Sequence, residues 1–410
     1  MKIRAFHGLR YSGDAPNAGA NAAPPYDQIN PEQRDVFHQR AHHFAHLIRP
    51  VAAGDLHAHD NSSRLHSSWL ADGITLRDSA CCLYANSIES PTGETRYGLT
   101  TLIDIETPES AIIRPHEETV EKTVAERLDL LRKTGIDYEP ILVLANDRGD
   151  LDTLLAADCT GPSLADHTDE FGNIHRLYAI GTPERIEAYR EALDESYGLI
   201  ADGHHRYKTG RLFASEGEAT RGRAAAAKLG VITSLSSSAL AIEPIHRALP
   251  TRLDPARLAG VCLQQTRWTG TSGSQLAEAV AQAPQPTLAL LSSDGSALLC
   301  RLDPRRGPRD LPEAASDLSV VLLHRTLFPL WGIAASAATD GTVKYRSDPD
   351  DLLESVTGGD FPSGIVLPPM TPDGFAAGIA DGDVLPPKST RFLPKVVSGL
   401  VWASHSDPID

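Results

Sequence analysis

A short apolar run that leads directly into a polar, glycine-containing turn constrains the fold of this chain more than any other feature. Residues 197–201 are typical of a buried strand, and a helix is predicted to continue through Leu212 and Phe213. The turn between them is Asp202-Gly203-His204-His205-Arg206. Glycine has no Cβ atom, so the backbone can turn tightly there, and the first N–H groups of the following helix lack intrahelical partners. The sequence therefore predicts a strand, a tight turn and a helix in immediate succession.

Helix and strand signals are mixed along the rest of the chain. Strands are predicted at 79–86, 96–105, 141–144, 229–242, 287–291 and 297–300, with an Asp294-Gly295 hairpin turn between the last two. Helices are predicted at 31–49, 119–133, 183–195, 274–283 and 318–330. We therefore expect an α+β fold with mixed sheets.

The length of 410 residues allows more than one compact unit. We predict four parts. They are an N-terminal αβ unit over 1–110, a core over 111–250 that carries the polar turn, a small inserted subdomain over 251–310, and a C-terminal unit over 311–410 that carries the Pro-Pro-Lys-Ser-Thr segment.

Composition argues against several classes of protein. Proteins that bind a nucleic-acid backbone usually carry a basic face. The net charge here is −16 and no basic segment stands out, so a nucleic-acid partner is not expected. There is neither a run of eighteen apolar residues nor an apolar N-terminal stretch, so we expect no membrane span and no secretory signal. The five cysteines include no Cys-x-x-Cys pair, which indicates reduced thiols rather than disulfides or a zinc site. We predict a cytoplasmic protein.

The polar turn is the sharpest candidate for chemistry. Gly203 would let backbone N–H groups approach an anion, and Arg206 could clamp a phosphate with two hydrogen bonds. His204 and His205 could donate to phosphate or move protons. Asp202 could accept a proton or hold Mg²⁺. The alternative is a polar turn whose two histidines have only structural partners.

Three other segments are weaker candidates. His116-Glu117-Glu118 precedes the 119–133 helix and could supply a general base or a metal-binding carboxylate. Alternatively, its acidic side chains are surface groups that only stabilise the helix by interacting with the positive end of its dipole. Lys388-Ser389-Thr390, with Lys395 beyond it, could hold phosphate oxygens or form a solvated turn, although the glycines of a P-loop are missing. His38, His42 and His46 have helical spacing and could bind a metal, or line a polar helix face.

Several strings together resemble the domain-of-unknown-function 1015 family. They occur in the family's order and cover nearly the whole chain: Phe6-His7-Gly8-Leu9-Arg10-Tyr11, Ala23-Pro24-Pro25-Tyr26-Asp27, Arg114-Pro115-His116-Glu117-Glu118-Thr119, Ala201-Asp202-Gly203-His204-His205-Arg206-Tyr207, Pro244-Ile245-His246-Arg247 and Pro386-Pro387-Lys388-Ser389-Thr390. The chain departs from the family at Leu385, where a methionine is usual, and at Arg391, where an aromatic residue is usual. From these strings we predict that Arg114, His116, Tyr207, His246 and Arg247 contact the substrate.

The polar turn is also similar to the phosphate-binding loop of the ParB and sulfiredoxin-like superfamily, which includes free serine kinases. This resemblance implies a ParB/sulfiredoxin-like core in which residues 202–206 hold nucleotide phosphates and Mg²⁺. It also implies a carboxylate that activates the acceptor hydroxyl, and Glu117 or Glu118 is our choice for it. Sulfiredoxins carry a cysteine where His204 stands, so sulfinic-acid reduction is not expected.

The leading hypothesis is therefore a small-molecule kinase that uses ATP or ADP with Mg²⁺ and phosphorylates the hydroxyl of serine or a related compound. The phosphate-binding residues would be Gly203, His205, Arg206, Lys388, Ser389, Thr390 and Lys395. Two alternatives are a non-catalytic nucleotide-binding regulator or scaffold and a phosphate-ester hydrolase. The expected partners are a nucleotide and a small-molecule substrate, and a homodimer is left open.

Overall fold

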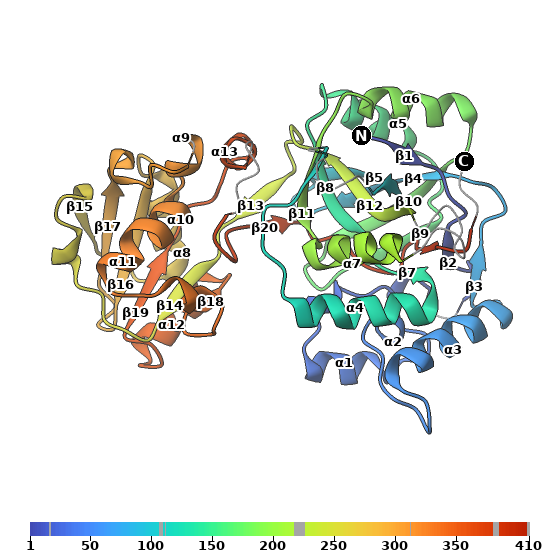
Figure 1. The fold of residues 1–410 in the computed structure, drawn as a ribbon, viewed down its shortest axis with the longest axis horizontal. Helices are drawn as coiled ribbons and strands as arrows, with labels where there is room; N and C mark the ends of the chain where they lie inside the picture. Colours follow the sequence, from blue (N-terminus) through green and yellow to red (C-terminus); the bar gives the residue numbers. More distant parts are fainter. Residues whose placement is uncertain are drawn as a thin grey trace. The chain divides into compact units, whose positions relative to one another are not determined.

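The chain forms two compact units in a computed structural model (Figure 1), which describes residues 1–15, 18–105, 110, 112–216, 226–311, 313–379 and 385–407. Unit 1 consists of Met1–Pro115, Thr119–Leu240 and Pro394–Asp410. Unit 2 consists of His116–Glu118 and Ala241–Leu393. Both units combine helices with sheets, which confirms the predicted α+β class.

Unit 1 is built on a nine-stranded mixed sheet with the order β6-β11-β8-β12-β5-β4-β10-β9, and β1 pairs with β5 beside this path. Its strands are β1 (Ile3–Arg4), β4 (Leu83–Glu89), β5 (Thr95–Asp104), β6 (Ile113–Arg114), β8 (Ile141–Ala145), β9 (Ala165–Thr168), β10 (Ile174–Ile180), β11 (Gly198–Asp202) and β12 (Ala227–Ser234). The β6–β11 and β8–β12 pairs are parallel and the other pairs are antiparallel. The predicted strands near 79–86, 96–105 and 141–144 are therefore confirmed.

Helices α5 (Asp150–Asp158) and α6 (Pro183–Leu193) lie together against the sheet (Figure 1). Their Leu151, Leu155, Tyr189 and Leu193 join a core that includes Val143 of β8. All five residues of β8 are buried, which is why that strand is a continuous apolar run.

Helix α4 (Glu121–Thr134) packs against α3 (Ala58–Ala71) and α7 (His204–Ser215). Val124, Leu128 and Leu131 on one face of α4 are buried. The helix ends at Gly135, whose φ of 66° is left-handed, as the predicted Thr134-Gly135 stop requires.

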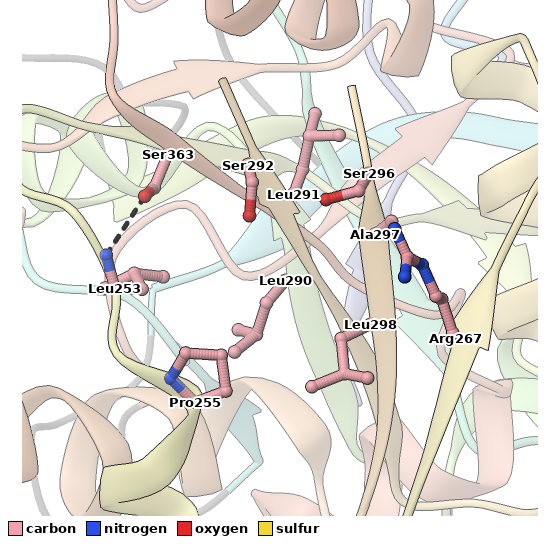
Figure 2. A pocket seen from close by; sticks show the side chains of 10 residues that line it. All are labelled: Leu253, Pro255, Arg267, Leu290, Leu291, Ser292, Ser296, Ala297, Leu298 and Ser363. Atoms are coloured by element: carbon pink, nitrogen blue, oxygen red, sulfur yellow. Dashed lines mark hydrogen bonds between the residues drawn. The ribbon is translucent and has the colours of Figure 1, made fainter. Parts of the chain in front are cut away.

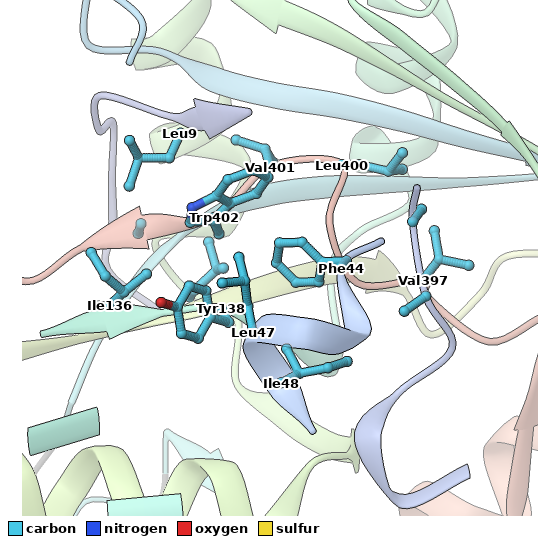
Figure 3. Close-up of a cluster of buried hydrophobic side chains, with 14 of the residues drawn as sticks. Leu9, Phe44, Leu47, Ile48, Ile136, Tyr138, Val397, Leu400, Val401 and Trp402 are labelled. Atoms are coloured by element: carbon cyan, nitrogen blue, oxygen red, sulfur yellow. The ribbon is translucent and has the colours of Figure 1, made fainter. Parts of the chain in front are cut away.

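A second core of unit 1 joins segments from both ends of the chain (Figure 3). Trp402 is fully buried and its ring centroid lies 4.9 Å from that of Phe44. Two small antiparallel pairs border this core: β2 (Leu9–Tyr11) with β3 (Thr75–Arg77), and β7 (Ile136–Asp137) with β21 (Ala403–Ser404). The last part of the chain thus belongs to the same core as the first.

The predicted helix over 31–49 is wrong as one helix. Residues Pro31–Phe37 form α1 and Ala45–Ile48 form α2, with turns between them. The His43 ring stacks on Phe37 at 4.3 Å and accepts a hydrogen bond from the N–H of Ala45, and these contacts stabilise the break. The three histidines with helical spacing therefore do not share a helix face, and the described residues contain no cluster of three or more His, Cys, Asp or Glu suited to a metal ion.

Unit 2 contains a six-stranded antiparallel sheet with the order β15-β17-β16-β19-β14-β18. The strands are β14 (His246–Leu249), β15 (Cys262–Trp268), β16 (Thr287–Ser292), β17 (Ala297–Leu302), β18 (Lys344–Arg346) and β19 (Ser363–Val366). Helices α8 (Gly273–Gln282) and α12 (Pro349–Thr357) bury Leu276, Val280, Leu352 and Val356 against Ala289 and Leu291 of the sheet.

Besides the 3₁₀ turns at Pro255–Leu258, Pro304–Arg306 and Ala335–Ala338, the remaining elements of unit 2 are short. They are the β13 (Ala241–Glu243) and β20 (Arg391–Leu393) pair, α9 (Glu313–Ser316), α10 (Ser319–Leu322) continued by a π-helical turn (Leu323–Leu327) and α11 (Phe328–Leu330), and α13 (Pro372–Gly378). The three consecutive helical pieces account for the helix predicted over 318–330.

Two boundaries in the structure differ from those predicted. The strand predicted over 229–242 is interrupted, because turns at 234–240 separate β12 of unit 1 from β13 of unit 2. Residues 251–310 share their sheet with β14, β18 and β19 from the segments on either side. The contacts thus divide the chain into two units rather than into the four predicted parts. The four-part division and the ParB/sulfiredoxin-like core both stay predictions. No helix in the described ranges is long and apolar enough to cross a membrane.

Candidate functional site

The polar turn connects β11 directly to α7, as predicted. β11 ends at Asp202 and α7 begins at His204, so Gly203 alone makes the turn. Gly203 has a φ of 92° and a ψ of 30°, a left-handed conformation that favours glycine. A Cβ atom there would lie 2.9 Å from Cγ2 of Ile141 and 3.0 Å from Nε of Arg206. The glycine therefore serves both the backbone conformation and the close packing of the turn.

Asp202 is held by two cations. One carboxylate oxygen forms an ion pair with Arg206, and the other accepts a hydrogen bond from Nζ of Lys395 at 2.6 Å. Burial alone would raise the pKa of Asp202, but the charges of Lys395 and Arg206 outweigh it and hold the pKa well below its ordinary value. An aspartate that stays ionised in this way is a weak proton acceptor. With both oxygens engaged, it fits a magnesium ion only if one of the cations moves away.

Arg206 lies inside unit 1 and is only 7% exposed. Its guanidinium donates to the carbonyl oxygen of Pro140 as well as to Asp202. Burial would lower its pKa, but the charges of Asp202 and Glu139 raise it. The guanidinium is thus held by contacts within unit 1, and it stabilises the turn by linking Asp202 to the backbone at Pro140.

A buried polar network that the sequence interpretation missed surrounds Arg206. The residues are Arg127, Asp137, Glu139 and Lys228, and with Arg206 they line a cavity of about 40 Å³. Lys228 pairs with Asp137 and donates to the carbonyl oxygen of Glu139 at 3.0 Å. The available signal was weak: it was a lysine near the start of the strand Ala227–Ser234, which has no other charged residue.

The two histidines of the turn have different surroundings. His205 accepts a hydrogen bond at Nε2 from the N–H of Val120, the residue that precedes α4, at 2.9 Å. This Nε2 therefore carries no proton, and the bond ties the turn to the start of α4. His204 is 6% exposed, and Tyr207 is buried among the core residues of unit 1. Arg114 lies over the ring of Tyr197, 4.1 Å from its centroid.

The other predicted residues gather in unit 2. His116 donates or accepts at Nε2 with the Thr390 hydroxyl at 3.2 Å and packs edge-on against Phe375. Glu117 accepts a hydrogen bond from the N–H of Lys388 at 3.1 Å. Lys388 has a φ of 58°, which is uncommon for a residue with a side chain. The structure thus brings the 116–118 and 386–390 segments together within unit 2.

His246 and Arg247 are both buried in β14. Arg247 is fully buried and donates to Nε2 of His324 and to the carbonyl oxygens of Ile245 and Pro387. Burial lowers the pKa of His246 to about 4 and that of His324 to about 3, so both rings are neutral at neutral pH. A neutral His324 can accept the arginine hydrogen bond.

A cavity of about 190 Å³ in unit 2 contains none of the predicted residues (Figure 2). It is lined by Leu290 and Leu298 together with Ser292, Ser296 and Arg267. The Ser363 hydroxyl at its edge is engaged by the N–H of Leu253 at 3.0 Å. The predicted chemistry is therefore not located in this hollow.

A family model described as "Protein of unknown function (DUF1015)" matches residues 3–306. The chain belongs to the DUF1015 family. The match includes the polar turn and the 114–119 and 244–247 strings, and it ends before the Pro-Pro-Lys-Ser-Thr segment.

This DUF1015 protein also has distant likenesses among solved structures. A conserved hypothetical protein from Pyrococcus furiosus is 13% identical with a TM-score of 0.36, covering 73% of this chain and 95% of that one. A free serine kinase variant in complex with ADP is 14% identical with a TM-score of 0.38, covering 76% and 95%. SbnI from Staphylococcus aureus, with a C-terminal truncation, is 11% identical with a TM-score of 0.35, covering 73% and 85%. No curated protein matched the chain. Likenesses of this size do not indicate what the DUF1015 chain binds.

The predicted residues thus form two groups. Asp202, Gly203, His204, His205, Arg206 and Lys395 belong to unit 1, together with Arg114 and Tyr207. His116, Glu117, Glu118, His246, Arg247, Lys388, Ser389 and Thr390 belong to unit 2. Lys388 and Lys395, which were predicted to act together, therefore fall in different units.

Proposed function

We propose that this protein is a nucleotide-dependent kinase that phosphorylates the hydroxyl of serine or a related small hydroxy compound. The observation that carries the proposal is the β11–Gly203–α7 turn, in which a left-handed glycine leads straight into a helix N-terminus next to Lys395 and Arg206. Helix N-termini after a tight glycine turn are suited to phosphate, because the first N–H groups point along the helix axis toward the anion and the helix dipole favours negative charge there.

In this proposal the residues of the turn act mainly by position and charge. Phosphoryl transfer requires alignment and neutralisation of negative charge more than covalent participation by the protein. Lys395 would contact phosphate oxygens, with Asp202 holding its ammonium group in place. Mg²⁺ would arrive with the nucleotide and keep most of its ligands from phosphate and water, which is its usual mode of binding.

The proposed base is Glu117, rather than Glu118. Glu117 is partly buried and oriented by the N–H of Lys388, whereas Glu118 is exposed. A general base must be held in one orientation to take a proton efficiently from a hydroxyl.

The test compares two matched variants. Glu117→Gln keeps an oxygen that can accept the Lys388 N–H, so the local structure should persist while the base is lost. We expect kcat to fall by roughly 10²-fold or more, with nucleotide binding retained. Glu118→Gln removes the neighbouring charge and should keep most of the activity. Equal loss in both variants, or in neither, would contradict the assignment of Glu117.

The activity itself is tested with purified protein, Mg²⁺, ATP or ADP, and a panel of serine, threonine, homoserine and related hydroxy compounds. Phosphorus NMR should show a phosphomonoester of the acceptor and the shortened nucleotide. Intact nucleotide with every acceptor would rule out the kinase.

The two ion pairs of Asp202 also support the alternative of a non-catalytic nucleotide-binding regulator. With both oxygens engaged, the turn can bind an anion without supplying a base, as a nucleotide-binding regulator would. That function predicts saturable stabilisation by nucleotide without turnover, and the same lack of turnover in wild type and Glu117→Gln. Release of phosphate from a phosphomonoester without nucleotide would instead indicate a hydrolase.

A further inference from the structure

Arg96 is a buried arginine in β5 for which the described structure offers no counter-charge. Its side chain is among the largest that are fully buried, with 1% exposure. Within the described part of the chain, none of its three guanidinium nitrogens has a hydrogen-bond partner. By contrast, the buried arginines Arg127, Arg206 and Arg247 each donate to a backbone carbonyl.

Such a side chain is costly to the folded state. Burying an unpaired cation removes its hydration shell, and the penalty is several kcal/mol even after the protein relaxes. Burial lowers the pKa of Arg96 to about 10, so the group remains charged at neutral pH. A folded protein that keeps this charge inside is expected to obtain compensation for it from another source.

Two histidines lie in the same cross-strand row as Arg96. Arg96 pairs across the sheet with Ile88 of β4, and Ile88 pairs on its other side with His175 of β10. His175 in turn pairs with His167 of β9. Side chains at directly opposed positions of neighbouring strands project from the same face of a sheet. Arg96, His175 and His167 therefore form one row on one face of unit 1.

The acidic group bound to this row is already fully used. Asp169 accepts a hydrogen bond from His175 at 3.1 Å and one from the amide of Asn173 at 2.8 Å on one oxygen. Its other oxygen accepts from the N–H groups of Phe171 and Asn173, both at 2.9 Å. The lone pairs of Asp169 are thus occupied by local partners, which leaves the guanidinium of Arg96 uncompensated.

We propose that Arg96 anchors a buried anion site in unit 1 that takes a compact oxyanion, either a phosphate or a carboxylate group. The planar guanidinium can bind either group with two parallel hydrogen bonds. The site is separate from the β11–Gly203–α7 turn, and it does not depend on the proposed kinase activity. Free inorganic phosphate and a carboxylate-bearing small molecule are the two sources with this chemistry.

The experiment measures the thermal unfolding of the full chain in chloride, phosphate and acetate at equal ionic strength. An anion that binds only the folded state raises Tm in a saturable way. We expect wild type to gain on the order of 5 °C with the correct oxyanion relative to chloride. A response to phosphate alone identifies a phosphate group, and a response to acetate alone identifies a carboxylate.

Arg96→Met supplies the decisive comparison. Methionine fills a similar volume without charge, so this variant should be more stable than wild type in chloride and should lose the oxyanion response. Arg148→Met is the matched control, since Arg148 lies in the same unit with its side chain 82% exposed and should leave the response intact.

Two results would overturn the site. One is a Tm response of Arg96→Met equal to that of wild type, because the anion would then bind elsewhere. The other is an equal Tm of wild type in chloride and in the oxyanions, which would mean that water rather than an anion solvates the guanidinium of Arg96. If Arg96→Met does not fold, titration calorimetry of wild type and Arg96→Lys with phosphate and acetate decides instead. Absence of saturable binding to wild type, or equal binding to both proteins, excludes the site.

Discussion

At the scale of single residues, Asp202 is the side chain whose role changes most once its contacts are known. The sequence interpretation left it as a proton acceptor or a magnesium ligand. Its two ion pairs, with Arg206 and Lys395, instead make it the centre of a small ionic cluster. A carboxylate whose pKa is held low by two cations is suited to orient those cations.

Lys395→Met should therefore destabilise unit 1. One oxygen of the part-buried Asp202 would lose its partner, which costs about 1–3 kcal/mol in the free energy of unfolding. In wild type the folded pKa of Asp202 is depressed, so its contribution to stability is complete above the unfolded pKa of about 3.9 and is lost as the pH falls toward the folded value. The deficit of the variant should thus be largest at neutral pH and should shrink in acid. Urea unfolding at pH 7 and at pH 3 measures it.

Lys388→Met is the control for that experiment. Lys388 is an exposed lysine in unit 2, and its replacement should change the free energy of unfolding by less than about 0.5 kcal/mol. A loss for Lys395→Met that is no greater than this, or that grows in acid, would show that the Asp202 ion pair is not stabilising.

At the scale of elements, the β11–Gly203–α7 connection is the part that local sequence describes best. Its apolar strand, its single glycine and the helix after it were all predicted, because each depends on the preferences of a few consecutive residues. The 31–49 segment shows the opposite case. Its residues favour a helix, but the packing of Phe37 and His43 divides it, and such contacts cannot be read from local pattern.

Gly203→Ala should destabilise unit 1 more than an ordinary glycine replacement. The left-handed backbone alone costs about 1 kcal/mol for a residue with a side chain. The added Cβ would also lie 2.9 Å from Ile141, which forces the turn to shift. We expect a total loss of about 2–4 kcal/mol in the free energy of unfolding.

Gly149→Ala separates the two causes. Gly149 precedes α5 with a φ of 89°, but nothing lies within 4 Å of a Cβ built there. Its replacement should show only the backbone cost. If chemical denaturation gives the same loss for both variants, the close packing at Gly203 does not contribute.

At the scale of the whole molecule, histidines buried in a neutral state set the response to acid. Burial lowers the pKa of His43 to about 3 and of His66 to about 4 in unit 1, and that of His246 to about 4 in unit 2, against an ordinary value of 6.5. The unfolded chain therefore binds protons first as the pH falls. Stability from these groups is complete above about pH 6.5 and is lost as the pH falls to about 4 for His66 and His246 and to about 3 for His43.

His246→Asn tests one member of this set. Asparagine offers an oxygen near the position of Nδ1, which accepts the N–H of Leu367 at 3.2 Å, but it does not titrate. Wild type should lose on the order of 3 kcal/mol through this residue between pH 7 and pH 4, and the variant should not. His57→Asn, at an exposed position, should keep the wild-type pH profile. Parallel stability curves for wild type and His246→Asn would exclude the effect.

The sequence by itself determined the family, the α+β class, most strands and helices, and the strand–glycine–helix turn, since these follow from short-range patterns. Only the tertiary structure decided which charges meet. The pairing of Asp202 with Lys395 spans 193 positions, and the burial of Arg96 without a partner depends on strands from four segments. Burial and ion pairing alter the charge and the freedom of a side chain, and they depend on neighbours that are distant along the chain. The turn at Gly203 was therefore visible in the sequence, while the ionic cluster that holds its aspartate was not.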